Sequence, residues 1–253
     1  KSEVIELQNV TANQATNNAR QIFKAIAGVN VWESDGAGLQ LSIGARGLDP
    51  NRTSNFNTRQ NGYDISADAL GYPESYYTPP VQALKRIEIV RGAASLQYGS
   101  QFGGLLNFVF KKGNKKKQIE FITENTIGSF GLVSSFNSLG GEKKGLNYYA
   151  FYQRKQGDGW RDFSKFEQNT AFVSLLKTFS KRLKIGIEYT FMNYVAQQAG
   201  GLKDFDFVQN PQQSLRTRNW FKVNWNLAAL TLNYKISEKI KLNSKVFVLA
   251  AQR

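Results

Sequence analysis

A loop-rich stretch, Asp49–Pro80, carries the residue types best suited to binding an anion. Arg offers a planar fork that matches carboxylates, while Tyr and Asn add hydrogen-bond donors and flat contact area. This composition predicts a surface for an anionic metal chelate or another carboxylate-rich small molecule. The alternative is that the stretch only packs inside the fold, with its polar groups satisfied by water. The candidate ligand-binding residues are Asp49, Arg52, Asn55, Arg59, Gln60, Tyr72, Tyr76 and Tyr77.

Enzymatic chemistry is narrowly limited by the composition. The 253 residues contain no Cys and no His. Cys nucleophiles, His general bases, Ser-His-Asp triads, disulfides and zinc sites of Cys or His ligands are therefore impossible. Of the ordinary catalytic groups only carboxylates, Lys, Tyr and Ser/Thr remain. We predict no catalytic residue, no metal site and no cofactor, and thus a protein that is not an enzyme.

The chain is basic, with 33 Lys and Arg against 19 Asp and Glu and a formal net charge of +14. The basic run Lys111–Lys117 lacks interleaved aromatic residues, which favours contact with anionic lipid or solvent over nucleic acid. No run of about 18 apolar residues exists, so a transmembrane helix is excluded. A transmembrane β-barrel is not, because its strands alternate lipid-facing and lumen-facing residues. Lys1–Val10 has no apolar core, so no signal peptide is predicted there.

The first half of the chain has the mixed pattern of a small α+β domain. A helix is predicted from about Ala19 to Ile26, and a second short one from Ala83 to Arg86. Gly47–Pro80 has the composition of loops. Strands are predicted at Gly28–Trp32, Leu39–Ile43, Arg86–Val90 and Leu105–Phe110.

After Lys117 the apolar pattern has a period of almost purely two, as in β-strands. About seven strands are predicted, most of them near the roughly 9–11 residues that cross a bilayer when tilted. The strand that starts near residue 217 loses its phase at Ala228-Ala229, which predicts a bulge. The predicted strands start near residues 118, 131, 146, 169, 183, 217 and 240.

The connections between these strands alternate in length, as in outer-membrane barrels. The tight ones are Gly140–Gly145, Ser180–Arg182 and Ser237–Lys239, and the long ones are Gln156–Gln168 and Ala196–Arg216. A water-soluble β-sandwich also alternates and remains an alternative on this pattern alone. If the first half fills the lumen, roughly 22 strands are needed to enclose it. We therefore expect a partial chain, whose open edge near Arg253 would be paired in the whole barrel.

The stretch Ala83–Lys112 reads ALKRIEIVRGAASLQYGSQFGGLLNFVFKK. With AGVNVW and IGARGL upstream, it resembles the plug of the TonB-dependent outer-membrane receptors. RGLDPNR at Arg46–Arg52 and YGSQFGGLLNFV at Tyr98–Val109 resemble the ferric citrate receptors within that family. Two positions depart from the family pattern: Asn61 stands where its turn has Asp, and Asp49 where a ferric citrate receptor has Thr. In order, over about residues 19–112, the matching elements are Gly28-Val29-Asn30-Val31, Ala45-Arg46-Gly47, Asn61-Gly62, Arg86-Ile87-Glu88, Arg91-Gly92, Tyr98-Gly99, Gly103-Gly104 and Leu106-Asn107.

The resemblance implies an α+β plug domain over residues 1–113. The first antiparallel strands of a transmembrane β-barrel would follow over residues 114–253. It also implies ion pairs between plug and barrel from Arg46, Glu88 and Arg91. The alternative is that these three are ordinary solvated strand charges.

By the same resemblance, the chain is expected to be an importer in the outer membrane of a Gram-negative bacterium. The cargo would be a ferric chelate such as ferric citrate or another siderophore, so that iron is present only within the transported compound. Expected partners are this chelate, outer-membrane lipid, and a TonB-type protein that pulls on a segment at or before Lys1–Leu7. A receptor for cobalamin or a glycan, and a ligand sensor that does not transport, are the alternatives.

Overall fold

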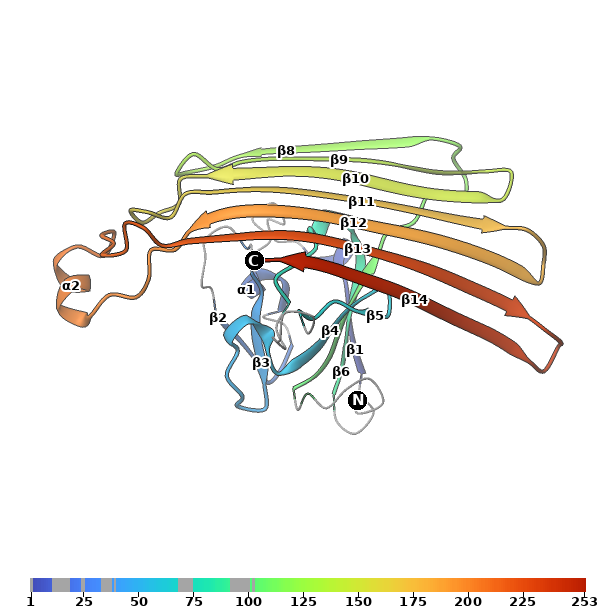
Figure 1. Cartoon of the computed structure of the whole chain (residues 1–253), viewed down its shortest axis with the longest axis horizontal. Coiled ribbons are helices and arrows are strands. Elements are labelled where there is room, and N and C mark those ends of the chain that lie inside the picture. The colour runs from blue at the N-terminus through green and yellow to red at the C-terminus, as the bar shows by residue number, and fades with distance from the viewer. Residues whose placement is uncertain are drawn as a thin grey trace.

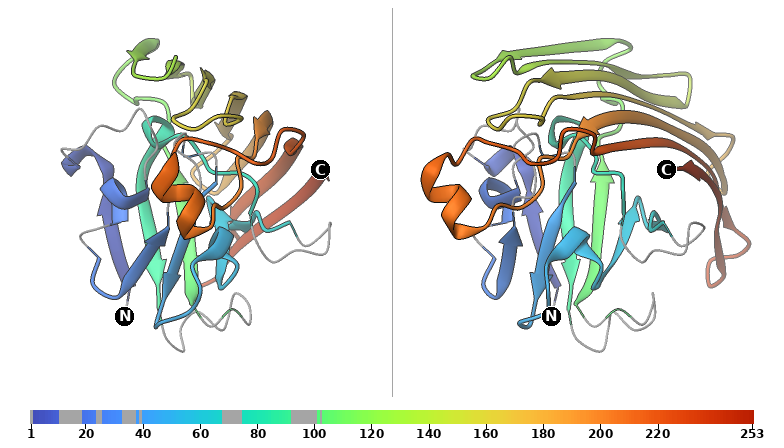
Figure 2. Two further views of the ribbon diagram at one scale, coloured as in Figure 1. Left: turned by 90° about the vertical axis from the view of Figure 1, so that its left-hand side faces the viewer. Right: turned by 60° about the vertical axis from the view of Figure 1, so that its left-hand side comes forward.

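The computed structural model describes residues 2–10, 19–23, 26–32, 38, 40–67, 75–91, 101 and 103–253. The described residues form mainly β-structure, in a five-stranded, a seven-stranded and a two-stranded sheet. Figures 1 and 2 show the long seven-stranded sheet curving over the smaller elements of the first half. The expected succession of an α+β domain and antiparallel strands is confirmed.

The described residues up to Phe110, here called the N-terminal domain, are built around the five-stranded sheet β1-β6-β7-β4-β5. Its central strand β7 pairs antiparallel with β6 and parallel with β4. The second sheet is the β2–β3 hairpin. The strands are β1 (Ser2–Glu6), β2 (Val29–Trp32), β3 (Ser42–Ala45), β4 (Phe56–Gln60), β5 (Tyr63–Asp64), β6 (Leu84–Val90) and β7 (Gly104–Phe110). The helical elements are η1 (Leu7–Asn9), α1 (Ala19–Phe23), η2 (Asn51–Thr53) and η4 (Val81–Ala83).

Two of the local predictions for this domain are wrong. The helix predicted at Ala83–Arg86 is strand, because η4 ends at Ala83 and β6 begins at Leu84. The predicted loop Gly47–Pro80 contains the hairpin of β4 and β5, whose turn places Asn61 and Gly62 at φ 46° and 88°. Asn-Gly suits such a turn because both central residues need positive φ. The polar sequence of β4, FNTRQ, has no alternation of apolar residues from which a strand could be predicted. The strand is nevertheless buried, because other elements pack around it.

A third prediction was placed too early in the chain. The strand expected at Leu39–Ile43 runs over Ser42–Ala45 instead, and Leu39 lies outside the described residues.

The second half forms a sheet in which every strand pairs antiparallel with its neighbours in sequence. We call strands β8–β14 the wall. Their number and approximate starting points agree with the predictions. The strands are β8 (Glu120–Ile127), β9 (Val133–Lys143), β10 (Leu146–Gly157), β11 (Phe166–Thr178), β12 (Leu183–Gln197), β13 (Trp220–Lys235) and β14 (Lys241–Gln252).

The bulge predicted at Ala228-Ala229 is absent, since the pairing of β13 with both β12 and β14 runs through these residues without a shift. The phase of the apolar pattern changes because the two faces of β13 have different surroundings. Near its start, Trp225 and its alternate neighbours are buried on the inner face. Further along, Leu230 and Tyr234 belong to the opposite, outer face and are exposed.

The N-terminal domain packs against the inner face of the wall, and one apolar core runs through both. Phe110 of β7 stacks on Phe172 of β11 and Phe151 of β10, with ring centroids 4.5 and 6.0 Å apart. In the part of the chain that the structure describes, no helix is long and apolar enough to span a membrane.

A short segment joins the N-terminal domain to the wall between the end of β7 at Phe110 and the start of β8 at Glu120. Asn147 of β10 holds it, accepting a hydrogen bond from the Gly113 amide (3.1 Å) and donating one to the Gly113 carbonyl (2.8 Å). A Cβ at Gly113 would lie 2.2 Å from the Gly141 carbonyl oxygen. Only glycine permits this close approach. The predicted domain boundary, residue 113/114, lies in this segment.

Candidate ligand site and the interface with the wall

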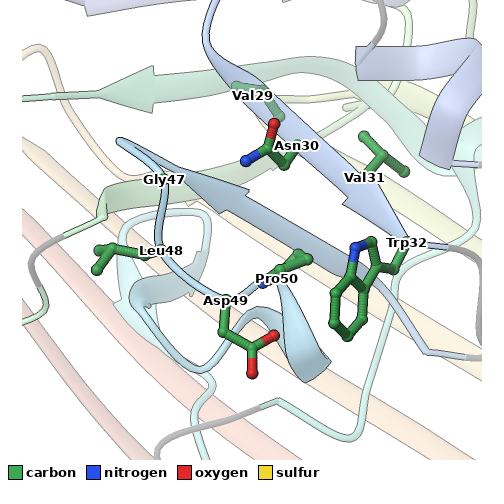
Figure 3. A pocket seen from close by; sticks show the side chains of 8 residues that line it. All are labelled: Val29, Asn30, Val31, Trp32, Gly47, Leu48, Asp49 and Pro50. Carbon is green, nitrogen blue, oxygen red and sulfur yellow. The ribbon is translucent and has the colours of Figure 1, made fainter.

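An open hollow of about 610 Å³ lies between β2 and the turn that follows β3 (Figure 3). The Trp32 ring, 56% exposed, and the Asp49 carboxylate lie on its lining. Figure 1 places β2 and β3 toward the same end of the molecule as α2 (Asp204–Gln209), which belongs to the longest connection of the wall. Of the predicted ligand surface Asp49–Pro80, only Asp49 and Pro50 line this hollow, and its other lining residues come from β2 and from Gly47 and Leu48.

The turn that carries Asp49 is fixed by its own side chains. The Asp49 carboxylate accepts a hydrogen bond from the Asn51 amide at 2.9 Å. The Asn55 side chain donates to the Asp49 carbonyl at the same distance. Asp49 remains exposed, while Arg52 lies in η2 with its side chain outside the description. Asp49 lies on the lining of the hollow and Asn55 is bonded to it, while the ligand contacts predicted for both residues stay a prediction.

Arg59 is engaged within its own hairpin. Its guanidinium donates to Asn57 Oδ1 at 2.6 Å and to the Gly62 carbonyl at 2.8 Å. These bonds brace the turn between β4 and β5. Arg59 is half-buried, so its predicted role as an anion fork has no support in its contacts.

Three further candidates lie in the interface with the wall rather than on a ligand surface. Gln60, Tyr76 and Tyr77 are at most 1% exposed. Gln60 donates to Thr190 of β12 at 2.8 Å, and Arg253 donates to the Tyr76 hydroxyl at 2.7 Å. In the described chain these three side chains pack against the wall, and their predicted contact with a ligand stays a prediction.

Burial also governs the chemistry of Tyr77. Its ring stacks on Trp225 of β13, and burial raises the pKa of the Tyr77 hydroxyl above its ordinary range. The remaining candidate ligand residue, Tyr72, lies outside the described residues.

The predicted ion pairs from Arg46, Glu88 and Arg91 to the wall are not formed in the described chain. Glu88 pairs with Arg86 at 2.6 Å, on the same strand. Arg91 pairs with Glu3 of β1 at 2.8 Å. Both pairs stay within the N-terminal domain. Arg46 is exposed in the turn after β3, at φ 60°, without an ion pair among the described residues.

A group of hydrogen bonds between the N-terminal domain and the wall, which the sequence did not predict, is centred on Glu188 of β12. Its carboxylate accepts hydrogen bonds from the Asn61 amide at 2.9 Å and the Tyr63 hydroxyl at 2.7 Å. Lys245 of β14 donates to the Asn61 carbonyl. Burial, and then the charge of Glu188, raise the pKa of Tyr63. We call Asn61, Tyr63, Glu188 and Lys245 the interface cluster.

A signal for this cluster was present in the sequence. Glu188 is a lone acid between apolar residues of β12, on the face that alternation assigns to the inside. A charge there requires a partner. Sequence alone did not show that the Asn-Gly turn would supply it.

At the end of the molecule near α2, two connections of the wall are joined to each other. The Asp162 amide donates to the Gln212 carbonyl at 2.9 Å, and Arg161 donates to the Gln213 carbonyl at 2.6 Å. Phe205 and Val208 of α2 are exposed, at 71% and 81%. These loops form one bonded unit beyond the wall.

The described side chains suit binding rather than reaction. No group of three or more Asp and Glu among the described residues could hold a metal ion. The hollow offers an aromatic ring, a carboxylate and backbone groups. These can contact a ligand and orient it by hydrogen bonds.

Comparison with known proteins supplies the family context. Residues 2–105 match the family model described as TonB-dependent Receptor Plug Domain. The ferrienterobactin receptor of Escherichia coli K12 is 24% identical over 89% of this chain and 31% of its own length. An iron-regulated outer membrane virulence protein of Vibrio cholerae is 33% identical over 37% of this chain and 15% of its own length.

Solved structures agree on the fold. The ferric citrate transporter FecA in its unliganded form aligns with a TM-score of 0.85 at 24% identity, covering 99% of this chain and 40% of FecA. The ferric-catecholate import receptor Fiu of Escherichia coli K12 aligns with a TM-score of 0.74 at 16% identity, covering 99% of this chain and 38% of Fiu. Among the curated relatives, the match spans about a third of the length of the ferrienterobactin receptor.

Proposed function

We propose that the chain belongs to an importer of a ferric chelate. In support, residues 2–105 match the TonB-dependent receptor plug domain, and the chain shares the fold of the ferric citrate transporter FecA. The cargo would be ferric citrate or another siderophore. Energy would come from a TonB-type coupling protein that acts on the N-terminal domain from the periplasm. The chain would contribute the plug, part of the ligand surface and the first strands of the barrel.

The observation that carries this proposal is the position of the N-terminal domain. It lies on the inner face of the wall, where aromatic stacking and the interface cluster hold it. A domain in that place obstructs the path along the wall. Transport therefore requires the domain to shift or partly unfold, and this is the step that needs external energy.

The hollow beside β2 supports binding of the cargo. Arg46 is next in the chain to Gly47 on its lining and is exposed. It is thus better placed than Arg59 to meet an anionic chelate. Trp32 would contact the organic part of the chelate. Asp49 would accept hydrogen bonds from its hydroxyl groups, or repel a fully ionised one.

Uptake of radioactive iron tests the proposal. The full-length protein is expressed in iron-starved cells that lack their own siderophore receptors, and iron is supplied as the citrate or the enterobactin complex. We expect uptake of one complex that stops when the coupling protein is deleted or the proton gradient is collapsed. If neither complex is taken up, ferric citrate and ferric enterobactin are excluded as cargoes. Uptake that continues without the coupling protein would contradict energy-coupled import.

Arg46→Gln tests the contribution of the hollow. We expect weaker binding of the anionic chelate with unchanged levels of folded protein in the membrane. Arg182→Gln, an exposed residue in a tight turn at the other end of the wall, is the matched control. Equal losses in both variants would show a general effect of charge.

A further inference from the structure

A second cavity, of about 180 Å³, lies where the N-terminal domain joins the wall. Lys85 of β6, and Lys111 and Lys112 after β7, line it from the domain. Ser138 of β9 and Tyr149 of β10 line it from the wall. The cavity is at the end of the wall that carries the tight connections, which in outer-membrane barrels faces the periplasm.

The charges around this cavity are unbalanced. None of its three lysines makes an ion pair among the described residues. The one described carboxylate of the lining, Glu120, is already held by the Lys117 ammonium at 2.7 Å and the Asn114 amide at 3.3 Å. Lys111 is half-buried, and burial lowers the pKa of its ammonium group. Lys85 and Lys112 are exposed, and the carboxylates of Glu120 and Glu124 both act on Lys111. With Lys117 included, the ammonium groups around the cavity outnumber these two carboxylates, which favours an anion there.

The wall side of the cavity contributes two neighbouring hydroxyl groups. Tyr149 is 6% exposed, and its enclosed hydroxyl interacts with the hydroxyl of Ser138. Ser138, beside it on the lining, is 5% exposed. A hydroxyl group can both donate and accept, so these two can each turn a donor toward an anion beside them.

We propose that this cavity binds a phosphate-type anion that bridges the N-terminal domain and the wall. The three lysines would supply the charge, and the hydroxyls of Ser138 and Tyr149 would donate hydrogen bonds to its oxygens. A phosphate group fits the volume and can accept from several donors at once. The anion could be free phosphate or the headgroup of an anionic lipid, since the cavity lies near the periplasmic rim. The inference does not depend on which cargo is transported.

Isothermal titration of the full-length protein with inorganic phosphate, at fixed ionic strength in chloride, tests this site. We expect binding that Lys85→Gln and Lys112→Gln each weaken at least about tenfold. Lys115→Gln and Lys116→Gln remove the same charge from the same segment without touching the cavity, and should leave the affinity unchanged. Absence of phosphate binding in the unaltered protein, or an equal loss in the control variants, would overturn the proposal.

Native mass spectrometry identifies the source of the anion. The protein is released from nanodiscs that contain phosphatidylglycerol, with and without added phosphate. A retained lipid that is lost in Lys85→Gln and Lys112→Gln would assign a headgroup, and a retained phosphate lost in the same variants would assign the free anion. Adducts that persist in both variants would contradict the site. Import of iron plays no part in either readout, so this site and the proposed function fail separately.

Discussion

Glu188 illustrates what a single charge does on the inner face of the wall. A carboxylate removed from bulk water is stable only when donors surround it. Asn61 and Tyr63 provide these donors from a turn of the N-terminal domain, and Lys245 completes the cluster through the Asn61 carbonyl. The residue thus joins two strands of the wall to the tip of one hairpin.

Glu188→Gln should loosen this tie. The amide keeps the shape but replaces charge-assisted hydrogen bonds with weaker neutral ones, so we expect a loss of about 1–3 kcal/mol in the free energy of unfolding. Denaturant titration of the full-length protein in detergent measures it. Glu167→Gln is the control, because Glu167 forms an ion pair with Arg154 that is about half exposed and should contribute less than about 1 kcal/mol. Equal losses would contradict a special role for Glu188.

Tyr77 should make the stability depend on alkaline pH. Burial raises its pKa in the folded protein, while the unfolded chain loses this proton near pH 10. The stability is therefore fully present below about pH 10 and falls above it, by up to about 1.4 kcal/mol per pH unit. Tyr77→Phe should reduce the slope measured between pH 9 and 11, and Tyr152→Phe, an exposed tyrosine, should not. An unchanged slope in Tyr77→Phe would refute the assignment.

For single residues, the sequence showed which side chains can form polar contacts but not which partners they contact. Asp49 and Asn55 lie together in one turn, a contact that the loop composition did not predict. Gln60, Tyr76 and Tyr77 could not be told from ligand residues, because a polar side chain looks the same in sequence whether it meets a ligand or a neighbouring strand. The partner of Arg91 was likewise set by the fold, which brings together Arg91 and Glu3 from more than eighty positions apart.

Among the elements, β12 shows how one strand serves two environments. Its outer face carries Leu183, Ile185, Ile187 and Tyr189, and then changes to Asn193. Its inner face carries Glu188, Thr190 and Tyr194 toward the N-terminal domain. The Tyr189 hydroxyl donates to Asn226 of β13, at the level where the outer face becomes polar. Such an aromatic residue is typical of the boundary between hydrocarbon and headgroups.

Lysine substitutions at two positions on the outer face of β12 test where its apolar band ends. Ile187→Lys should cost about 2–4 kcal/mol in lipid because the charge lies in the apolar band, whereas Asn193→Lys should cost at most about 1 kcal/mol. Folding of the full-length protein into vesicles, followed by electrophoretic mobility, compares the two. Similar costs at both positions would contradict an apolar band that ends between them.

The elements of the wall were predictable and those of the N-terminal domain were partly so. A period of two over many residues identifies a strand whichever face is buried, so all seven strands of the wall were found. The hairpin of β4 and β5 was missed because its burial comes from parallel pairing with β7, which leaves no alternation. The apparent bulge in β13 arose from a change of environment along the strand, which a local pattern cannot distinguish from a change of register.

For the whole molecule, the proposed import raises the question of whether the N-terminal domain must leave the wall. Gln40 donates to the Tyr194 hydroxyl at 2.7 Å, so their side chains meet across the interface. Because the 253 residues contain no Cys, introduced thiols have no competitors in this part of the protein. Gln40→Cys with Tyr194→Cys, joined by a short bifunctional maleimide, should abolish uptake while cargo binding persists. Tyr194→Cys alone, treated in the same way, is the control, and undiminished uptake in the joined protein would show that this contact need not open.

The two sheets also differ in how far apart in the chain their partners lie, and this has a consequence for folding. Every strand of the wall pairs with its immediate successor, so its hairpins close mostly short loops, and even the long one between β12 and β13 adds little entropic cost. The sheet of the N-terminal domain instead places Ser2 opposite Val90 and Phe56 beside Gly104, and such distant pairings form slowly. The wall should therefore acquire its hairpins first, and the earlier-synthesised domain should complete its sheet last, against a surface that is already formed.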